Sequence, residues 1–227
     1  MIESHNNNYK LNEELEEYEK EAFKAIEDAK KFSRILGIRE EKKFLKKEIK
    51  EVEKVGKIIE YELPKGWRVV EEYWILEPYC KVLIIYNDEE KDYRYVVVEP
   101  NLSSTEYEIY KELSLVLRDE IEKVEDDGRS KKEILKMIYD KIIKEIKFKI
   151  NDESYYKILY YMNRDFLLYG KITAFILDRV LEDISCNGYR KPIYVFHKNY
   201  TNIPTNIYFE RDELDSFVVN LAQKCGK

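Results

Sequence analysis

The chain has 227 residues, of which 44% are hydrophobic and 38% are charged, and its formal net charge is -6. This composition predicts one large or two small globular domains and excludes an intrinsically disordered chain. The acidic balance disfavours a nucleic-acid binder, which needs a net basic face, and no apolar run approaches the roughly eighteen residues of a membrane-spanning helix.

The start of the chain, MIESHNNNYKLNEELEE, has neither the basic nor the apolar region of a secretion signal. The three cysteines, Cys80, Cys186 and Cys225, are widely spaced and form no CxxC pair. This pattern is typical of a reducing compartment and predicts no structural zinc site. We therefore expect a cytoplasmic protein that reaches membranes through partners.

Two helices are predicted before residue 57. Apolar residues recur at three- and four-residue intervals from Leu11 to Leu36, and Gly37 is the expected stop. A shorter helix follows in the lysine-rich run Arg39–Lys54, with Phe44 and Ile49 on its apolar side. Because glutamates interleave with the lysines, a solvated face is the stronger interpretation of this run, and a partner-facing or membrane-surface element is the alternative.

After Lys57 the apolar period changes to two, which indicates strands. Two β-rich runs, Lys81–Tyr86 and Tyr93–Val98, are separated by the polar loop NDEEKD and predict a hairpin. Pro100 is expected to end the second strand, since proline cannot donate to a strand ladder.

Helices are predicted next. Ser103 with Glu106 has the spacing of a capping box and predicts a helix to about Lys123, and Ser130 with Glu133 repeats the spacing before another helix. A third helix is expected over Glu153 to Leu168, ending near Gly170.

The last part of the chain combines short strands with a helix. The stretch EDISCNGYRKPIYVFH, Glu182 to His197, predicts two strands joined by a turn at Asn187–Gly188, with room for a longer loop. We expect a further strand near Asn206–Phe209 and a final helix from Asp212 to about Cys225. The fold class is α+β, with regions 1–56 (charged helices), 57–128 (hairpin plus helix) and 129–227 (helices plus small sheets).

Few side chains are candidates for catalysis. His197 and His5 have no acid or base partner nearby in sequence, so a structural or surface role is the stronger interpretation for both. Glu182 and Asp183 are adjacent in a predicted strand and therefore point to opposite faces, which disfavours a shared acid–base role. Neither GxxxxGK[ST] nor GxGxxG occurs, so no phosphate-binding loop is recognisable. We predict no catalytic, cofactor-binding or metal-binding residue in this chain.

Several segments together resemble the N-terminal region of the archaeal type II/type IV secretion system ATPases, the hexameric motors of protein secretion, pilus assembly and the archaellum. They follow the family's order and approximate spacing: YRYVVVEPNLSSTE (93–106), MNRDFLLYGKI (162–172), LEDISCNGYRKPIYVFHKNY (181–200), IPTNIYF (203–209) and LDSFVVNLAQKCGK (214–227). The chain departs from the family at Leu168, Thr173–Ala174, Arg179–Val180 and Asn187.

The resemblance implies a docking and coupling region that is not catalytic alone. In such motors a RecA-like domain follows and binds ATP and Mg²⁺, and this chain stops at Lys227, before that region. The implied partners are the ATPase core, a polytopic membrane platform protein and, in the full-length protein, copies that complete a homo-hexamer. The family motifs imply core or domain-interface roles for Glu99, Pro100, Arg164, Asp165, Gly170, Glu182, Asp183, Gly188, Pro192, Thr205 and Asn206.

Two other functions stay open at this stage. The chain could be a stand-alone adaptor that binds the membrane platform or the ATPase. It could also be a nucleic-acid binder that uses its 20 tyrosines for base stacking. The acidic net charge disfavours the second of these.

Overall fold

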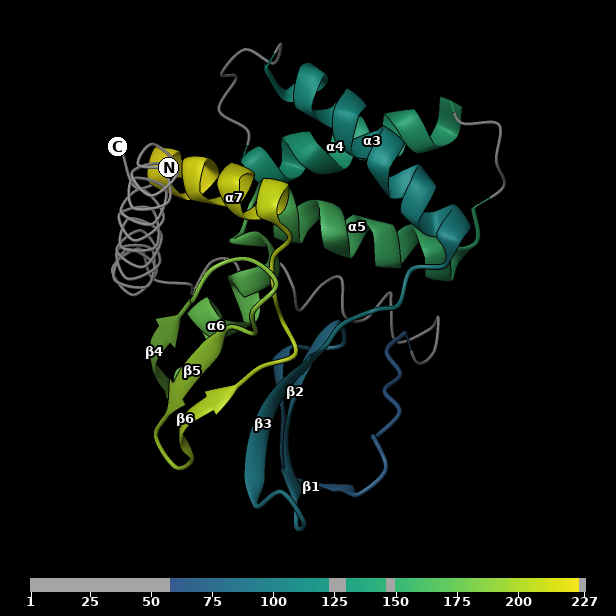
Figure 1. Ribbon diagram of the computed structural model, residues 1–227. Helices are drawn as coiled ribbons and strands as arrows, with labels where there is room; N and C mark the ends of the chain where they lie inside the picture. Colours follow the sequence, from purple (N-terminus) through teal and green to yellow (C-terminus); the bar gives the residue numbers. More distant parts are fainter. Residues whose placement is uncertain (1–57, 123–129, 146–149, 225–227) are drawn as a thin grey trace, which may run out of the picture.

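The computed structural model describes residues 58–122, 130–145 and 150–224. Both helices predicted before residue 57 lie outside the described residues, as do the lysine-rich run, His5 and Cys225. The described chain is α+β: two small antiparallel sheets stand beside a group of helices (Figure 1). The predicted fold class is therefore confirmed for this part of the chain.

The first sheet, sheet A, is a three-stranded antiparallel meander. Its strands are β1 (Trp67–Leu76), β2 (Cys80–Asn87) and β3 (Asp92–Val98), in the order β1-β2-β3. Tyr86 lies opposite Tyr93, so the predicted hairpin and its polar loop are confirmed. The central strand is buried on both faces, with Val82, Leu83, Ile84 and Ile85 all at most 5% exposed.

The helical group consists of α3 (Ser104–Glu122), α4 (Lys131–Glu145) and α5 (Asp152–Phe166). Both predicted capping boxes are present. The Ser103 amide donates to Glu106 Oε2 at 2.6 Å, and the Ser130 amide donates to Glu133 Oε2 at 2.9 Å. These side chains satisfy amides that would otherwise lack partners at the helix starts.

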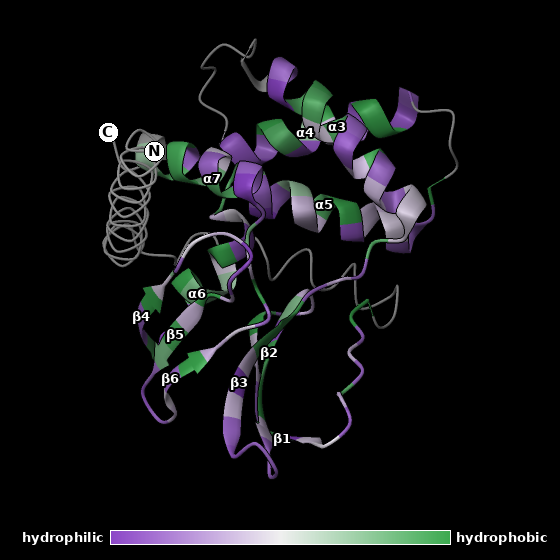
Figure 2. Ribbon diagram, in the orientation of Figure 1, coloured by the Kyte–Doolittle hydropathy of each residue, from purple (hydrophilic) through white to green (hydrophobic). Residues whose placement is uncertain are grey.

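The apolar faces of these three helices meet in one buried cluster. Figure 2 shows hydrophobic and hydrophilic residues side by side along each helix, as amphipathic helices require. The boundary predicted at residues 128–129 falls between α3 and α4, which share this cluster. Its buried members are Leu113, Leu117, Leu135, Ile138, Tyr139, Ile158, Leu159 and Met162.

A second sheet, sheet B, follows two short helices. These are η1 (Gly170–Ile172) and α6 (Thr173–Leu177), and the strands are β4 (Leu181–Ser185), β5 (Tyr194–His197) and β6 (Thr201–Pro204). The last element of the described chain is α7 (Arg211–Lys224), which confirms the predicted last helix.

The β4–β5 connection is the longer loop that the sequence left open as an alternative. It runs over Cys186–Ile193, and Gly188 (φ +97°) and Arg190 (φ +57°) in it adopt the left-handed conformation. The expected strand near Asn206–Phe209 is wrong: the strand lies earlier, at β6. At Asn206 the contact with β3 is made by the side chain, which bonds to the backbone of Val97.

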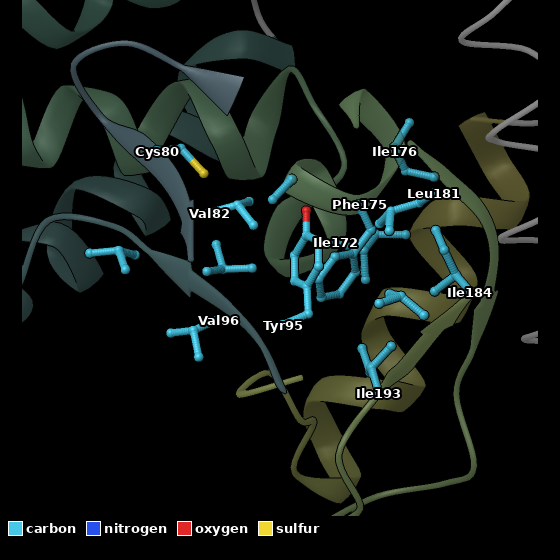
Figure 3. Close-up of a cluster of buried hydrophobic side chains, with 14 of the residues drawn as sticks. Cys80, Val82, Tyr95, Val96, Ile172, Phe175, Ile176, Leu181, Ile184 and Ile193 are labelled. Carbon is cyan, nitrogen blue, oxygen red and sulfur yellow. The ribbon is translucent and has the colours of Figure 1, made fainter. Parts of the chain in front are cut away.

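The larger buried cluster takes its side chains mainly from the two sheets, α6 and α7. The ring of Tyr95 on β3 meets Phe175 on α6 edge-on, with centroids 5.6 Å apart. Figure 3 shows both rings among Ile172, Leu181 and Ile184. The core thus joins residues of sheet A, α6 and sheet B, which fixes how the two sheets face one another.

Candidate functional site

The first of two buried polar junctions lies where sheet A meets the helical group. Arg164 on α5 donates from Nη1 to Glu99 Oε2 and from Nε to Asp165 Oδ1, both at 2.7 Å. Arg164 is only 8% exposed. Because Glu99 directly follows β3, this cluster ties the end of the sheet to α5. We call Glu99, Arg164 and Asp165 the Arg164 junction.

Three tyrosine hydroxyls complete this junction. Tyr160 donates to Glu99 Oε1 at 2.6 Å, Tyr110 on α3 donates to Asp165 Oδ2 at 2.5 Å, and Tyr161 donates to the Pro100 carbonyl at 2.6 Å. Together with Arg164, these hydroxyls give every oxygen of both carboxylates a donor. A buried ion pair needs such compensation, because desolvation otherwise outweighs the attraction between its charges.

Arg164 and Tyr160 keep their protons in this junction. Burial acts to lower the pKa of Arg164, but the Glu99 and Asp165 carboxylates outweigh it and raise that pKa well above its ordinary value. Burial and the Glu99 carboxylate likewise raise the pKa of Tyr160, which therefore keeps its proton and remains a donor. Groups that hold their protons so firmly are suited to structure rather than to proton transfer.

The second polar junction links two strands of sheet A to the segment after α6 through one carboxylate. Asp178, 5% exposed, directly follows α6 and accepts the hydroxyls of Tyr73 on β1 and Tyr95 on β3, each at 2.7 Å. Its other oxygen accepts the Val180 amide at 3.0 Å. Burial and this carboxylate raise the pKa of Tyr95. We call Asp178, Tyr73 and Tyr95 the Asp178 junction.

A further polar link, between β3 and the residue that follows Thr205, uses an amide side chain. Asn206 Oδ1 accepts the Val97 amide at 2.8 Å, and Asn206 Nδ2 donates to the Val97 carbonyl at 2.9 Å. The neighbouring Thr205 is buried and forms an isolated parallel bridge with Tyr95. Asn206 therefore occupies the free edge of β3 in place of a further strand.

The predicted interface residues fall into three groups. Glu99, Pro100, Arg164 and Asp165 meet at the Arg164 junction, and Gly170 (φ +56°) lies close enough that an added Cβ would be 3.8 Å from Asp165 Oδ1. Thr205 and Asn206 lie at the contact between the sheets. The other four lie on β4 or its loop and take no part in the hydrogen bonds of either junction: Glu182 and Pro192, both exposed, Asp183 and Gly188.

Several residues of the junctions were not expected from the sequence. Asp178, Tyr73, Tyr95 and Tyr160 come from segments far apart in the chain. The sequence carried one indirect signal, an aspartate directly after the apolar run ITAFIL. A charged residue bounded by a buried segment needs a partner, but nothing in the sequence says which one.

The described residues offer little chemistry of the catalytic kind. No group of three or more metal-ligating side chains occurs among them. Cys80 is 1% exposed, and its burial raises the pKa of its thiol, which disfavours the reactive thiolate. His197 is fully buried. Nor does any helix in these ranges have the length and apolarity needed to cross a bilayer.

Part of the chain matches a known family. Residues 29–101 match the family described as PilB3-like, N-terminal. The matched span contains all of sheet A and ends directly after Glu99 and Pro100 of the first junction. The match suggests a relationship to the N-terminal regions of pilus and secretion ATPases.

Three relatives come from the archaeon Methanocaldococcus jannaschii, and all are uncharacterized proteins. MJ1288 is 38% identical over 151 residues, which are 65% of this chain and 60% of that relative. MJ0900 is 27% identical over 165 residues, 63% of this chain and 30% of that protein. MJ0781 is 38% identical over 53 residues, 23% of this chain and 7% of that protein. The chain is thus similar to archaeal proteins, and these matches cover 60% or less of each relative's length.

Proposed function

We propose that the chain is the N-terminal docking and coupling region of a hexameric ATPase that powers protein secretion or the assembly of a type IV pilus or archaellum. The observation that carries this proposal is the match of residues 29–101 to the PilB3-like N-terminal family. In this proposal the chain does not hydrolyse ATP by itself, and ATP and Mg²⁺ bind to a separate catalytic domain of the same protein.

The buried junctions support a mechanical role. A motor that changes shape with its nucleotide passes the movement on only through parts that move as rigid bodies. The Arg164 junction ties β3 to α3 and α5, while the Asp178 junction ties β1 and β3 to the segment after α6. The described elements are therefore joined by polar contacts as well as by their apolar core.

The proposed partners follow from this role. The ATPase core of the same protein and a polytopic membrane platform protein are the expected binding partners, and a homo-hexamer is the expected full-length assembly. The region would then be cytoplasmic and reach the membrane through the platform. The segment 1–56 is the proposed platform contact, because its lysines and glutamates form a highly charged sequence.

A stand-alone adaptor is the second candidate, and the length of one relative favours it. The 151 matched residues make up 60% of MJ1288, so that relative has about 250 residues, the size of one or two domains. A relative of that size has little room for a RecA-like domain beside the matched part. An adaptor would bind the platform or the ATPase without carrying a catalytic domain.

The first experiment compares this chain with the product of its gene's full open reading frame. ATP hydrolysis and nucleotide binding are measured for both, together with the assembly of rings. An inert chain beside a full product that hydrolyses ATP and forms rings supports the motor region. A full product that is no longer than this chain, is inert and binds the platform or the ATPase in a pull-down supports the adaptor. Nucleotide binding by this chain alone contradicts both.

A further inference from the structure

His197 is a buried titratable group outside both polar junctions. It is the last residue of β5, is 0% exposed, and lies opposite Leu181 of β4 and Thr201 of β6. Its Nδ1 accepts the backbone amide of Asn199 at 3.1 Å, which requires an imidazole without a proton on that nitrogen. Its Nε2 has no hydrogen-bond partner. The ring is therefore neutral, with its proton on Nε2.

The bond from Asn199 to His197 closes a strained turn. Residues 198–200 connect β5 to β6, and Thr201, the first residue of β6, has φ +59°. A β-branched residue rarely adopts this left-handed conformation, so surrounding contacts must hold it there. The bond to the imidazole is one of them, and the Lys198 amide donates to the Val180 carbonyl at 3.0 Å as another.

The same turn ties sheet B to sheet A. Tyr200 donates its hydroxyl to Glu71 Oε2 on β1 at 3.0 Å, and its ring lies 4.9 Å from the ring of Tyr93 on β3. The ring of His197 also contacts Tyr200, with centroids 4.9 Å apart. The imidazole thus contacts Tyr200, the residue that bonds to Glu71 of sheet A.

The charged groups that act on His197 come from two elements. Asp178, after α6, and Glu71, on β1, are both carboxylates and favour the protonated ring. The surrounding hydroxyls of Tyr73, Tyr95 and Tyr200 are already donated to these carboxylates. Burial is the larger effect and lowers the pKa of His197, so the neutral ring persists in the closed turn.

We propose that His197 is a proton-sensitive latch between the two sheets: the neutral imidazole keeps the β5–β6 turn closed against β1, and protonation opens that turn. An imidazolium carries a proton on both nitrogens. Its Nδ1–H would then face the amide N–H of Asn199, and two donors cannot bond to each other. Opening of the turn removes Tyr200 from Glu71, which leaves that carboxylate to pair with the charged ring.

Amide hydrogen exchange of the whole chain tests the latch. The protection factor of the Asn199 amide is measured from about pH 8 to about pH 5, beside the titration of the His197 ring by NMR. We expect protection to fall by up to about tenfold per pH unit below the ordinary imidazole value of about 6.5. The Ile193 amide, bonded to the Ile207 carbonyl elsewhere in sheet B, should keep its protection.

Two variants separate the latch from general acid sensitivity. In His197→Asn the side-chain oxygen can take the place of Nδ1 and cannot gain a proton, so Asn199 protection should not vary with pH. In His197→Phe the acceptor is lost, so protection should be low at every pH. The chain has two histidines, so the NMR signal that disappears in His5→Gln belongs to His5 and the one that remains belongs to His197. The Asn199 protection of this variant should vary with pH as it does in the unmodified chain.

Either of two results overturns the proposal. The first is a His197 ring that titrates near its ordinary value of about 6.5 while Asn199 protection stays constant. The second is an equal acid-induced fall in His197→Asn. The first needs only the unmodified chain, so it applies even if a variant fails to fold.

Discussion

At the scale of single residues, Arg164 shows why a charged side chain can be more important inside a protein than on its surface. Its guanidinium is nearly buried and faces two carboxylates, each of which also accepts a tyrosine hydroxyl. Removing one member of such a cluster leaves uncompensated charges in a place that water does not reach. Arg190 offers the contrast, since its ion pair with Glu210 is exposed.

Arg164→Ala is expected to lower the free energy of unfolding by about 3–5 kcal/mol, because Glu99 and Asp165 lose their counter-charge. Arg164→Lys should recover part of the loss, since an ammonium group cannot reproduce the forked geometry. Urea denaturation measures both. Arg190→Ala is the matched control and should change little. Equal effects for Arg164→Ala and Arg190→Ala would show that the junction contributes no more than a surface pair.

The environment of Glu106 predicts that the stability of the fold depends on pH. Burial acts to raise the pKa of Glu106, but hydrogen bonds from Ser154 and Ser103 outweigh it, so the pKa lies below its ordinary 4.5. A carboxyl with a depressed folded pKa stabilises the fold above the unfolded value and loses that effect as the pH falls through the folded value. Stability should therefore decrease on acidification below about pH 4.5.

The variant Glu106→Gln checks this assignment. It should lower the free energy of unfolding near neutral pH by about 1 kcal/mol, the usual size of a helix-cap contribution, and weaken the acid dependence. Thermal unfolding at several pH values measures both. Glu133→Gln changes the other capping box, which is exposed, and should have the smaller effect. An unaltered acid profile in Glu106→Gln would assign the dependence to another carboxylate.

At the scale of elements, the contact between the sheets depends on side chains that replace strand pairing. Asn206 gives the backbone of Val97 both an acceptor and a donor, so the edge of β3 needs no further strand. Val97 is 5% exposed, and an unpaired backbone group at such a position is costly.

Asn206→Ala is expected to lower the free energy of unfolding by roughly 2 kcal/mol, since it leaves the amide and the carbonyl of Val97 without partners. Denaturation midpoints measure the change. The control is Asn202→Ala on the exposed side of β6, which should be close to neutral. If both variants are equally stable, water replaces the Asn206 side chain and the edge of β3 is accessible.

At the scale of the whole molecule, the Arg164 junction joins the two apolar clusters found among the described residues. One cluster spans both sheets, α6 and α7, and the other fills the helical group. Tyr160 belongs to the first cluster and lies on α5, next to the helix residues of the second. A continuous connection of this kind favours cooperative unfolding.

We therefore expect β2 and α5 to open as one unit. Amide exchange in mild denaturant should give the same limiting free energy for the buried amides of both elements. Arg164→Ala should separate the two values, with α5 opening first. Two distinct values in the unmodified chain would mean that the helical group unfolds by itself, and the rigid coupling proposed for the motor would lose its support.

The sequence by itself determined the local elements. Periodicity and capping boxes predicted the β2–β3 hairpin, α3, α4, α5 and α7, because these signals depend on residues a few positions apart. The prediction of a strand near Asn206 was wrong. The side chain of Asn206 bonds to a strand more than a hundred positions earlier in the sequence. Of the expected interface residues, Glu99, Arg164 and Asp165 came together, and the resemblance to a family rather than any periodicity had pointed to them.

Only the tertiary structure decided which polar groups meet. Asp178 with Tyr73 and Tyr95, and His197 with the turn that holds Tyr200 on Glu71, join segments that are distant in the chain. The partners of a buried charge are set by how the sheets pack, and packing depends on the whole apolar core rather than on any short pattern. For this reason the sequence predicted the helices and the hairpin, whereas the junctions and the latch required the three-dimensional arrangement.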